Sequence, residues 1–342
     1  MSELEIHGTR FARPGKSFVS VPVTQDLTMP ITIDAHVVSG VEPGPVLLLL
    51  SMLHGNEWFS VPILREIVRR LDPTRLRGSV VAIPVANLAA FTTASRCVFD
   101  DSDEPDGNRT FGGVYDWITN QISRVIQNEF FSASTHLIDY HVSDWGSTMA
   151  DVSHMTDYRD ERLSRQSREM ALAYGFPVLH ALQIHSGLRG PRTSLGYAGE
   201  HYAIPGIVAG VGGLGFGSAQ EASWIETNVR GTLGVMQHLE MLEGSPPSVE
   251  RMLTVGDYWR VSPRCGGYLE PLIGLDRQFG TIHADELLAT VSSPTSFEVL
   301  DELRSPGEGI LFYSCRAHMV RPGGWAFGVA DAASSSWDDR TD

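Results

Sequence analysis

The strongest constraint on the fold of this chain is the alternation of buried apolar strands with segments of helical periodicity. Residues 46–53 read Val-Leu-Leu-Leu-Leu-Ser-Met-Leu, a continuous apolar run typical of a strand covered on both faces. Residues 61–71 then show the apolar spacing of a helix, and Arg69 and Arg70 suit its carboxyl end. Strands that alternate with helices favour a parallel or mixed α/β sheet with helices on both faces.

The same periodicities predict further elements along the chain. Strands are expected over 18–22, 31–38, 78–87, 136–142, 178–184 and 204–211. Helices are expected over 115–130, 159–174 and 219–242. Segments 91–113 and 185–201 show no clear period. The first is too long for a simple connector, so we expect it to be functional.

The pattern changes near Gly244-Ser-Pro-Pro-Ser, which reads as a linker. We therefore expect an α/β domain over 1–244, with β segments in 1–45, and a smaller all-β domain over 251–330. The polar tail, 332–342, is expected to fray. The β domain is expected to shape the entrance to a site or an interface in a homo-oligomer.

Charge and composition limit the classes of binding partner and the chemistry to be expected. The chain has 26 Lys+Arg against 41 Asp+Glu, a net charge of −15, which disfavours nucleic acids and anionic membranes. Lys16 is the only lysine, so lysine-based chemistry is disfavoured. The three cysteines form neither a disulfide framework nor a metal motif, and no apolar run approaches the roughly 20 residues that span a bilayer. A cytoplasmic location is the expectation.

Polar motifs follow three of the predicted strands, where α/β proteins place their sites. His54 and Glu57 can offer an imidazole and a carboxylate to one ion, and Gly55 allows the tight turn between them. Zinc enzymes often combine such a pair with a distant third ligand, for which His141 is a candidate. On spacing alone, ordinary structural histidines remain the commoner interpretation.

A second group of polar residues lies in the segment without a clear period. Arg96 and Arg109 are suited to binding a carboxylate or stabilising an oxyanion, and Asn108 adds a neutral donor beside them. Taken alone, this group is more commonly a solvated loop. His154, His180, His185 and Arg192 also lie near these segments, but each reads as an ordinary surface residue.

In combination, these segments resemble a known family. The order is His54-x-x-Glu57, Asn87-x-x-Ala90-Phe91, Arg96, Asp106-x-Asn108-Arg109-x-Phe111-x-Gly113 and Asp139-x-His141. It is similar to that of the succinylglutamate desuccinylase/aspartoacylase family of zinc-dependent amidohydrolases, which are related to metallocarboxypeptidases. The resemblance covers about residues 40–244, and it implies a zinc-carboxypeptidase-like mixed sheet flanked by helices.

The resemblance also implies a metal site and a reaction. His54, Glu57 and His141 would be the ligands of one Zn²⁺ per chain. The implied reaction is hydrolysis of the amide bond of a small carboxylate-bearing substrate, such as an N-acyl amino acid. Zinc supplies Lewis-acid chemistry of this kind in many hydrolases.

Further roles follow from the same resemblance. Asn108 and Arg109 would hold the substrate carboxylate, and Arg96 would polarise the scissile carbonyl and stabilise the oxyanion. Asp139 would orient a neighbouring ligand or be purely structural, whereas Asp106 would shape its loop.

The sequence departs from the family at one important position. The family has a general-base glutamate in a strand that matches 204–213, and Gly210 occupies its position here. General acid–base help is typically worth about 10²–10⁴-fold in rate. Three alternatives remain: another proton shuttle, a different reaction on the same scaffold, or an inactive ligand-binding homologue. The nearest acidic or basic residues read as solvated charges, and these are Glu200, His201, Glu221 and Glu226.

Overall fold

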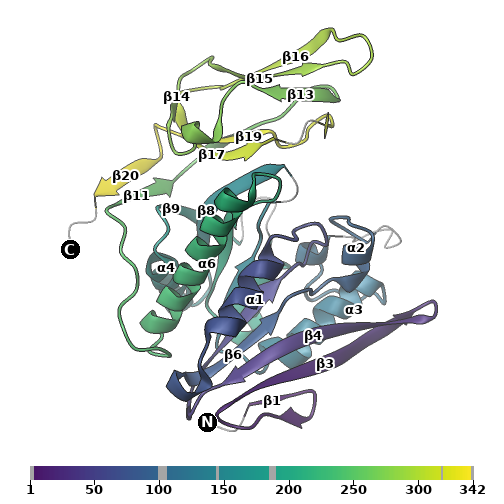
Figure 1. Cartoon of the computed structure of the whole chain (residues 1–342), viewed down its shortest axis with the longest axis vertical. Helices are drawn as coiled ribbons and strands as arrows, with labels where there is room; N and C mark the ends of the chain where they lie inside the picture. The colour runs from purple at the N-terminus through teal and green to yellow at the C-terminus, as the bar shows by residue number, and fades with distance from the viewer. Residues whose placement is uncertain (1–3, 99–105, 144–145, 185–189, 317–318, 340–342) are drawn as a thin grey trace.

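The computed structural model describes residues 4–98, 106–143, 146–184, 190–316 and 319–339, and the structural statements below refer to these ranges. A large mixed β-sheet runs through the molecule, with helices on both of its faces and a β-rich region at the C-terminal end (Figure 1). This confirms the predicted α/β architecture. Each described helix is too short or too polar to span a lipid bilayer.

The elements alternate as expected up to α6. The helical segments are α1 (Ser60–Arg70), η1 (Pro73–Arg75), α2 (Leu88–Thr92), η2 (Gly107–Arg109), α3 (Ile118–Val125), η3 (Ile126–Phe131), α4 (Glu161–Tyr174), α5 (Ser194–Tyr202), α6 (Ser218–His238) and η4 (Leu275–Arg277). The strands up to α6 are β1 (Glu5–Ile6), β2 (Thr9–Arg10), β3 (Gly15–Asp26), β4 (Met29–Ser39), β5 (Glu42–Ser51), β6 (Arg77–Ile83), β7 (His136–Tyr140), β8 (Ser147–Met155), β9 (Val178–Leu182) and β10 (Gly206–Gly212).

Four parallel strands form the centre of the sheet in the order β6-β5-β7-β10. In this register Leu50 of β5 and Val208 of β10 both lie beside Asp139 of β7. The carboxyl ends of β5 and β7 are therefore neighbours. As a result, the segment after β5, which contains His54, meets the segment after β7, which begins at His141.

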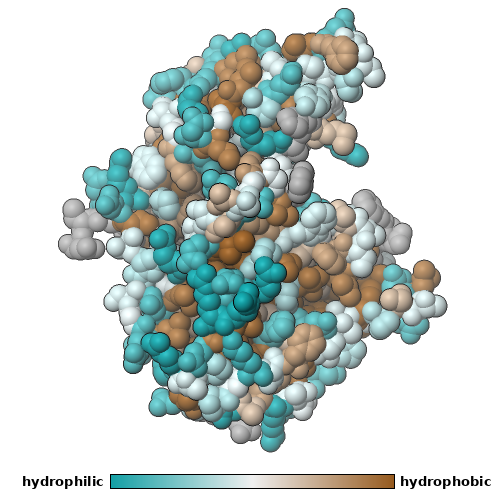
Figure 2. Space-filling model, in the orientation of Figure 1, coloured by the Kyte–Doolittle hydropathy of each residue, from teal (hydrophilic) through white to brown (hydrophobic). Residues whose placement is uncertain are grey.

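Helices cover both faces of this sheet, and each face has its own apolar core. Phe59, Ile63 and Ile67 from the region of α1 belong to one core, together with side chains from α4 and α6. Phe111 and Phe130 belong to the other, with side chains from α3, η3 and α5. Figure 1 shows α1, α4 and α6 together on the side nearest the viewer. The exposed sides of α1 and α6 are hydrophilic in Figure 2 and joined by a salt bridge from Arg70 to Glu226 (2.8 Å).

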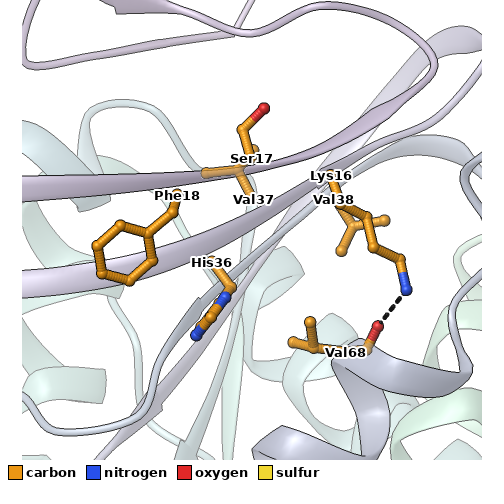
Figure 3. Close-up of a pocket in the computed structure, with 7 residues that line it drawn as sticks. All are labelled: Lys16, Ser17, Phe18, His36, Val37, Val38 and Val68. Atoms are coloured by element: carbon orange, nitrogen blue, oxygen red, sulfur yellow. Dashed lines mark hydrogen bonds between the residues drawn. The ribbon is translucent and has the colours of Figure 1, made fainter.

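Lys16, the only lysine of the chain, contacts the end of a helix. Lys16 Nζ donates to the carbonyl oxygens of Val68 (2.6 Å) and Arg69 (3.3 Å) at the end of α1, where unpaired helix carbonyls attract a cation. Figure 3 shows the contact with Val68 at the edge of a small cavity of about 290 Å³ between α1 and the β3–β4 hairpin. The Phe18 ring packs edge-on against His36 in the same cavity, with 5.2 Å between ring centroids.

Two of the longer elements were not expected from the sequence. Strand β8, Ser147–Met155, lies between β10 and β9 and is antiparallel to β10. Helix α5, Ser194–Tyr202, begins inside a segment predicted to be irregular, and Thr193 caps it by accepting a hydrogen bond from the Gly196 backbone N–H. Two glycines in α5, Gly196 and Gly199, weaken its apolar periodicity, which explains why the sequence pattern did not predict it.

The C-terminal region is rich in β structure, as predicted. Its strands are β11 (Arg251–Val255), β12 (Tyr258–Val261), β13 (Gly267–Pro271), β14 (Thr281–Ile282), β15 (Leu287–Ser292), β16 (Val299–Arg304), β17 (Gly309–Cys315), β18 (Met319–Val320), β19 (Phe327–Asp331) and β20 (Ser336–Asp339). A separate sheet has the order β16-β15-β13-β18. However, β11 pairs with β9 and β17 pairs with β8, so the large sheet continues into this region.

The tail differs from its expected state. Residues 336–339 form β20, which pairs antiparallel with β11. The prediction that the tail frays is therefore wrong for these four residues, because their backbone groups find partners at the edge of β11. Trp337 also packs against the apolar core.

Candidate metal centre

Glu57 lies between two histidines at the carboxyl ends of the parallel strands. Its Oε1 is 2.7 Å from Nδ1 of His54, and its Oε2 is 3.0 Å from Nδ1 of His141. Each residue offers one ligand atom to a common point, and these atoms all lie within 4.8 Å of one another. His54 and Glu57 are buried, whereas the His141 side chain is 12% exposed. The three residues predicted as metal ligands are thus brought together.

The turn between the two sequence neighbours depends on Gly55. A Cβ atom at this position would lie 2.2 Å from the carbonyl carbon of Ala90 and 2.3 Å from the nitrogen of Phe91. Only glycine allows the backbone of α2 to pass so close. The start of α2 is held in turn by Asn87, whose Oδ1 accepts from the Ala90 N–H (3.1 Å) and whose amide donates to the Leu53 carbonyl (3.3 Å).

Each histidine is also held on its far side by an aspartate. Nε2 of His54 is 2.9 Å from Oδ1 of Asp106, and Nε2 of His141 is 3.0 Å from Oδ2 of Asp139. Both rings therefore turn Nδ1 toward Glu57 while a carboxylate contacts Nε2. Carboxylates in this position fix the tautomer and orientation of metal-binding histidines. Asp106 was expected only to shape its loop, but it contacts His54 in the same way as Asp139 contacts His141.

A residue that sequence reasoning missed completes one of these pairs. The hydroxyl of Ser194, the first residue of α5, donates a hydrogen bond to Oδ2 of Asp139. Both residues are buried. The sequence carries a weak signal for this arrangement, because threonine is a typical N-cap residue and Thr193 directly precedes Ser194.

Asn108 and Arg109 lie beside the His141 pair. Oδ1 of Asn108 accepts from the Ser194 backbone N–H (2.8 Å), which leaves Nδ2 facing Nε2 of His141 at 2.9 Å. Arg109 donates to the Asn108 carbonyl (2.5 Å). In this structure the Asn108 amide thus faces a histidine and α5, whereas a role in holding a substrate carboxylate stays a prediction.

Arg96 lies at the open side of the centre. Its two terminal nitrogens are 3.4 Å from Oε1 of Glu57 and 3.3 Å from Oδ2 of Asp106. Its side chain is 48% exposed, in contrast to the buried Glu57. The guanidinium therefore connects the buried Glu57 and the partly exposed Asp106 to the solvent side of the centre.

The electrostatics of the centre favour a cation. Burial raises the pKa of Glu57, but His54 and His141 together hold it well below its usual range. Burial lowers the pKa of His141, but Asp139 and Glu57 raise it to about 10. Three carboxylates, of Glu57, Asp106 and Asp139, surround two imidazoles, so neutral imidazoles would leave an excess of negative charge. Two imidazole nitrogens and one carboxylate oxygen are a typical donor set for zinc, and the residues present fit this ion.

Position 210 lies beside the centre, on β10. A Cβ atom built on Gly210 would be 3.2 Å from the carbonyl oxygen of His141 and 3.3 Å from the Met149 methyl group. The nearest charged residues considered as substitutes have other contacts. Glu200 pairs with Arg159 (3.1 Å) and Glu226 with Arg70 (2.8 Å).

The remaining candidates are also engaged elsewhere. Glu221 accepts from the Gly215 and Phe216 backbone N–H groups, and the ring of His201 stacks on Tyr197 at 4.1 Å. The expectation that His154 and His180 lie on the surface is wrong, since both are buried on β8 and β9. His185 lies outside the described residues.

The fold and the centre together define a mixed α/β protein with a buried His-Glu-His cluster suited to a metal ion. Residues 43–239 match the family model described as the succinylglutamate desuccinylase/aspartoacylase catalytic domain. The chain belongs to this family, whose members are deacylating hydrolases.

Solved structures agree with this fold over nearly the whole chain. A succinylglutamate desuccinylase/aspartoacylase from Rhodobacter sphaeroides is 20% identical, with 97% of this chain and 98% of that chain covered and a TM-score of 0.76. The ectoine utilization protein EutE from Ruegeria pomeroyi, in a product-bound structure, is 20% identical, with 97% and 100% covered and a TM-score of 0.78. A succinylglutamate desuccinylase from Silicibacter is 21% identical, with 97% and 100% covered and a TM-score of 0.76. No curated protein matches the chain at a significant level.

Proposed function

We propose that this protein is a zinc-dependent hydrolase that cleaves the amide bond of a small carboxylate-bearing substrate, such as an N-acyl amino acid. The observation that carries the proposal is the paired arrangement of the two histidines. Both turn Nδ1 toward Glu57 while an aspartate contacts Nε2. Two such pairs on one carboxylate are expected of a metal centre and unnecessary for packing alone.

In this proposal His54, Glu57 and His141 hold one zinc ion per chain. Zinc bound there acts as a Lewis acid toward a carbonyl and lowers the pKa of water. The protein's part is to direct Nδ1 of both imidazoles toward the ion, which Asp106 and Asp139 favour by contacting Nε2 of the two rings. Glu57 is buried, and its charge therefore attracts a bound cation more strongly than it would in water.

Two arginines supply positive charge for the substrate in this proposal. Arg96, half-exposed beside Glu57, is placed to stabilise the oxyanion that develops on the substrate carbonyl. Arg109 follows Asn108 in η2 and is proposed to bind the substrate carboxylate, for which a planar guanidinium is well suited. A cytoplasmic location and a small-molecule partner belong to the same proposal.

The glycine at position 210 favours two alternatives to amide hydrolysis. A chain that keeps the metal ligands and lacks the usual carboxylate would suit a different reaction on this scaffold, or ligand binding without turnover. These alternatives predict zinc binding without release of a free acid and an amine.

The test is turnover of a panel of N-acetyl and N-succinyl amino acids by zinc-loaded protein, with product analysis. We expect release of free acid and amine that stops when a chelator removes the zinc and returns when zinc is restored. A protein that binds zinc and turns over no member of the panel contradicts the hydrolase proposal. A protein that binds no zinc contradicts the assignment of His54, Glu57 and His141.

A further inference from the structure

The unexpected strand β8 places a carboxylate directly across from Gly210. Strands β8 and β10 are antiparallel, and Asp151 is the register partner of Gly210. Directly opposed residues in an antiparallel pair project from the same face of the sheet, with Cβ positions roughly 4.5–5.5 Å apart. The Asp151 side chain therefore leaves the sheet on the face where a residue-210 side chain would.

This face also carries part of the metal centre. On β7, Asp139 lies beside Val208 of β10, and side chains two residues apart in a strand share a face. Position 210 therefore projects on the same face as Asp139, whose carboxylate contacts the His141 ring. Three adjacent strands thus bring His141, the bare backbone of Gly210 and Asp151 to one face of the sheet.

The surroundings of Asp151 suit a group that exchanges a proton. Its Oδ2 accepts a hydrogen bond from the Ser153 hydroxyl (2.6 Å) and lies 3.6 Å from Nδ1 of His180 on β9. All three side chains are buried, with Asp151 only 3% exposed. The rings of Tyr258 and Phe312 pack against His180, with centroids 5.3 and 6.3 Å away. The hydroxyl donor favours the ionised carboxylate, which is the form that accepts a proton.

Gly210 lies between this group and the metal centre. A Cβ atom at position 210 would be 3.2 Å from the His141 carbonyl oxygen, 3.3 Å from the Met149 methyl group and 3.4 Å from the Asp151 carbonyl oxygen. The backbones of His141 and Asp151 therefore border position 210 on its two sides, and a glutamate side chain placed there requires the Met149 side chain to shift.

We propose that Asp151 supplies the carboxylate that position 210 lacks, as the proton acceptor and donor of the hydrolysis. The inference rests on the proposed function. Asp151 takes a proton from the attacking water as the carbon–oxygen bond forms, and the carbon–nitrogen bond then breaks as that proton passes to the leaving amine. The two products are a carboxylic acid and an amine, and no oxidant or reductant is required.

The test compares four proteins: wild type, Asp151→Asn, Gly210→Glu and the double variant. Asparagine has nearly the same shape as aspartate and no proton-accepting carboxylate. We expect Asp151→Asn to keep its zinc and its KM while kcat falls by about 10²–10⁴-fold. Adding Gly210→Glu to this variant should restore at least about a tenth of the wild-type kcat, because the carboxylate returns from the neighbouring strand. Asp301→Asn, at another buried aspartate that pairs with Arg264, is the matched control and should leave kcat unchanged.

The outcomes separate this inference from the proposed function. If wild type is active and Asp151→Asn is equally active, the inference alone is overturned. The inference alone is also overturned if Asp151→Asn loses activity and the double variant does not regain it, although the single Gly210→Glu variant is active. A zinc-loaded wild type without turnover overturns both.

A second variant keeps the test informative if Asp151→Asn fails to fold. Ser153→Ala removes the hydroxyl donor to Asp151 and leaves the carboxylate in place. It should move the acidic limb of the kcat/KM pH profile to higher pH, with zinc content unchanged. An acidic limb that stays where it is in the wild type overturns the inference.

Discussion

The hydroxyl of Ser194 donates a hydrogen bond to the carboxylate of Asp139, which lies 55 positions earlier in the chain. The accepting atom, Oδ2, is the one that also contacts His141, whereas Oδ1 makes no hydrogen bond to the described residues. One oxygen atom therefore links the start of α5 to the metal centre. This contact ties the orientation of His141 to the position of α5 on the sheet.

Ser194→Ala tests this link. Without the hydroxyl, the buried Asp139 carboxylate loses a donor and holds the His141 ring less firmly. Zinc affinity should fall by about 10–100-fold, the usual cost of losing a contact behind a metal ligand. Competition with a chromophoric chelator measures this directly. Ser167→Ala is the matched control, since Ser167 is also buried and donates to the Gly206 carbonyl away from the centre. Equal affinities in both variants would contradict the link.

Glu57→Gln tests the centre itself. The amide keeps the size of the side chain but removes the charge that contacts both histidines. Zinc affinity should fall by more than about 100-fold, beyond the effect of a contact behind a ligand. Metal analysis after dialysis checks the result, with Glu66→Gln on the exposed side of α1 as control. Retention of one zinc by Glu57→Gln would rule out its assignment as a ligand.

Arg96→Gln tests the proposed oxyanion role. Because the guanidinium is half-exposed, its loss should not disturb folding. We expect kcat to fall by about 10²–10³-fold with little change in KM, as for other residues that stabilise developing negative charge. Steady-state kinetics at constant zinc content measures this. The control is Arg124→Gln, which removes an arginine that pairs with exposed Asp116. A rise in KM at constant kcat would instead indicate that Arg96 binds the substrate in its ground state.

The stability of the protein should decrease on mild acidification because of His154. Burial lowers the pKa of this histidine from 6.5 to about 4, so the folded protein keeps it neutral while the unfolded chain takes up a proton. Its contribution is therefore complete above pH 6.5 and lost as the pH falls toward 4. The full difference is about 3 kcal/mol.

Urea unfolding at pH 7 and pH 4.5 measures this effect. His154→Gln should flatten the dependence of unfolding free energy on pH, whereas the same change at the exposed His36 should leave the slope as it is. An unchanged slope in His154→Gln would show that other groups carry the acid sensitivity.

The chain itself determined most of the architecture and the set of metal-binding residues. The apolar run at 46–53 became β5, the periodicity at 61–71 became α1, and the motif His54-x-x-Glu57 lies at the turn between them. Such features are local: they depend on periodicity over a few residues, on glycine at one turn and on ligand spacing. The family resemblance was readable for the same reason.

Only the tertiary structure decided which distant residues complete the site. Strand β8 was not recognised, so the pairing of Asp151 with Gly210 had no sequence signal. Ser194 reaches Asp139 because α5 packs on the sheet, and Asp106 reaches His54 because Gly107 lets its loop approach the Leu53 carbonyl. Strand register and helix packing bring together residues far apart in the chain, and these contacts are set by the burial of whole elements. A pattern within one segment does not contain that information.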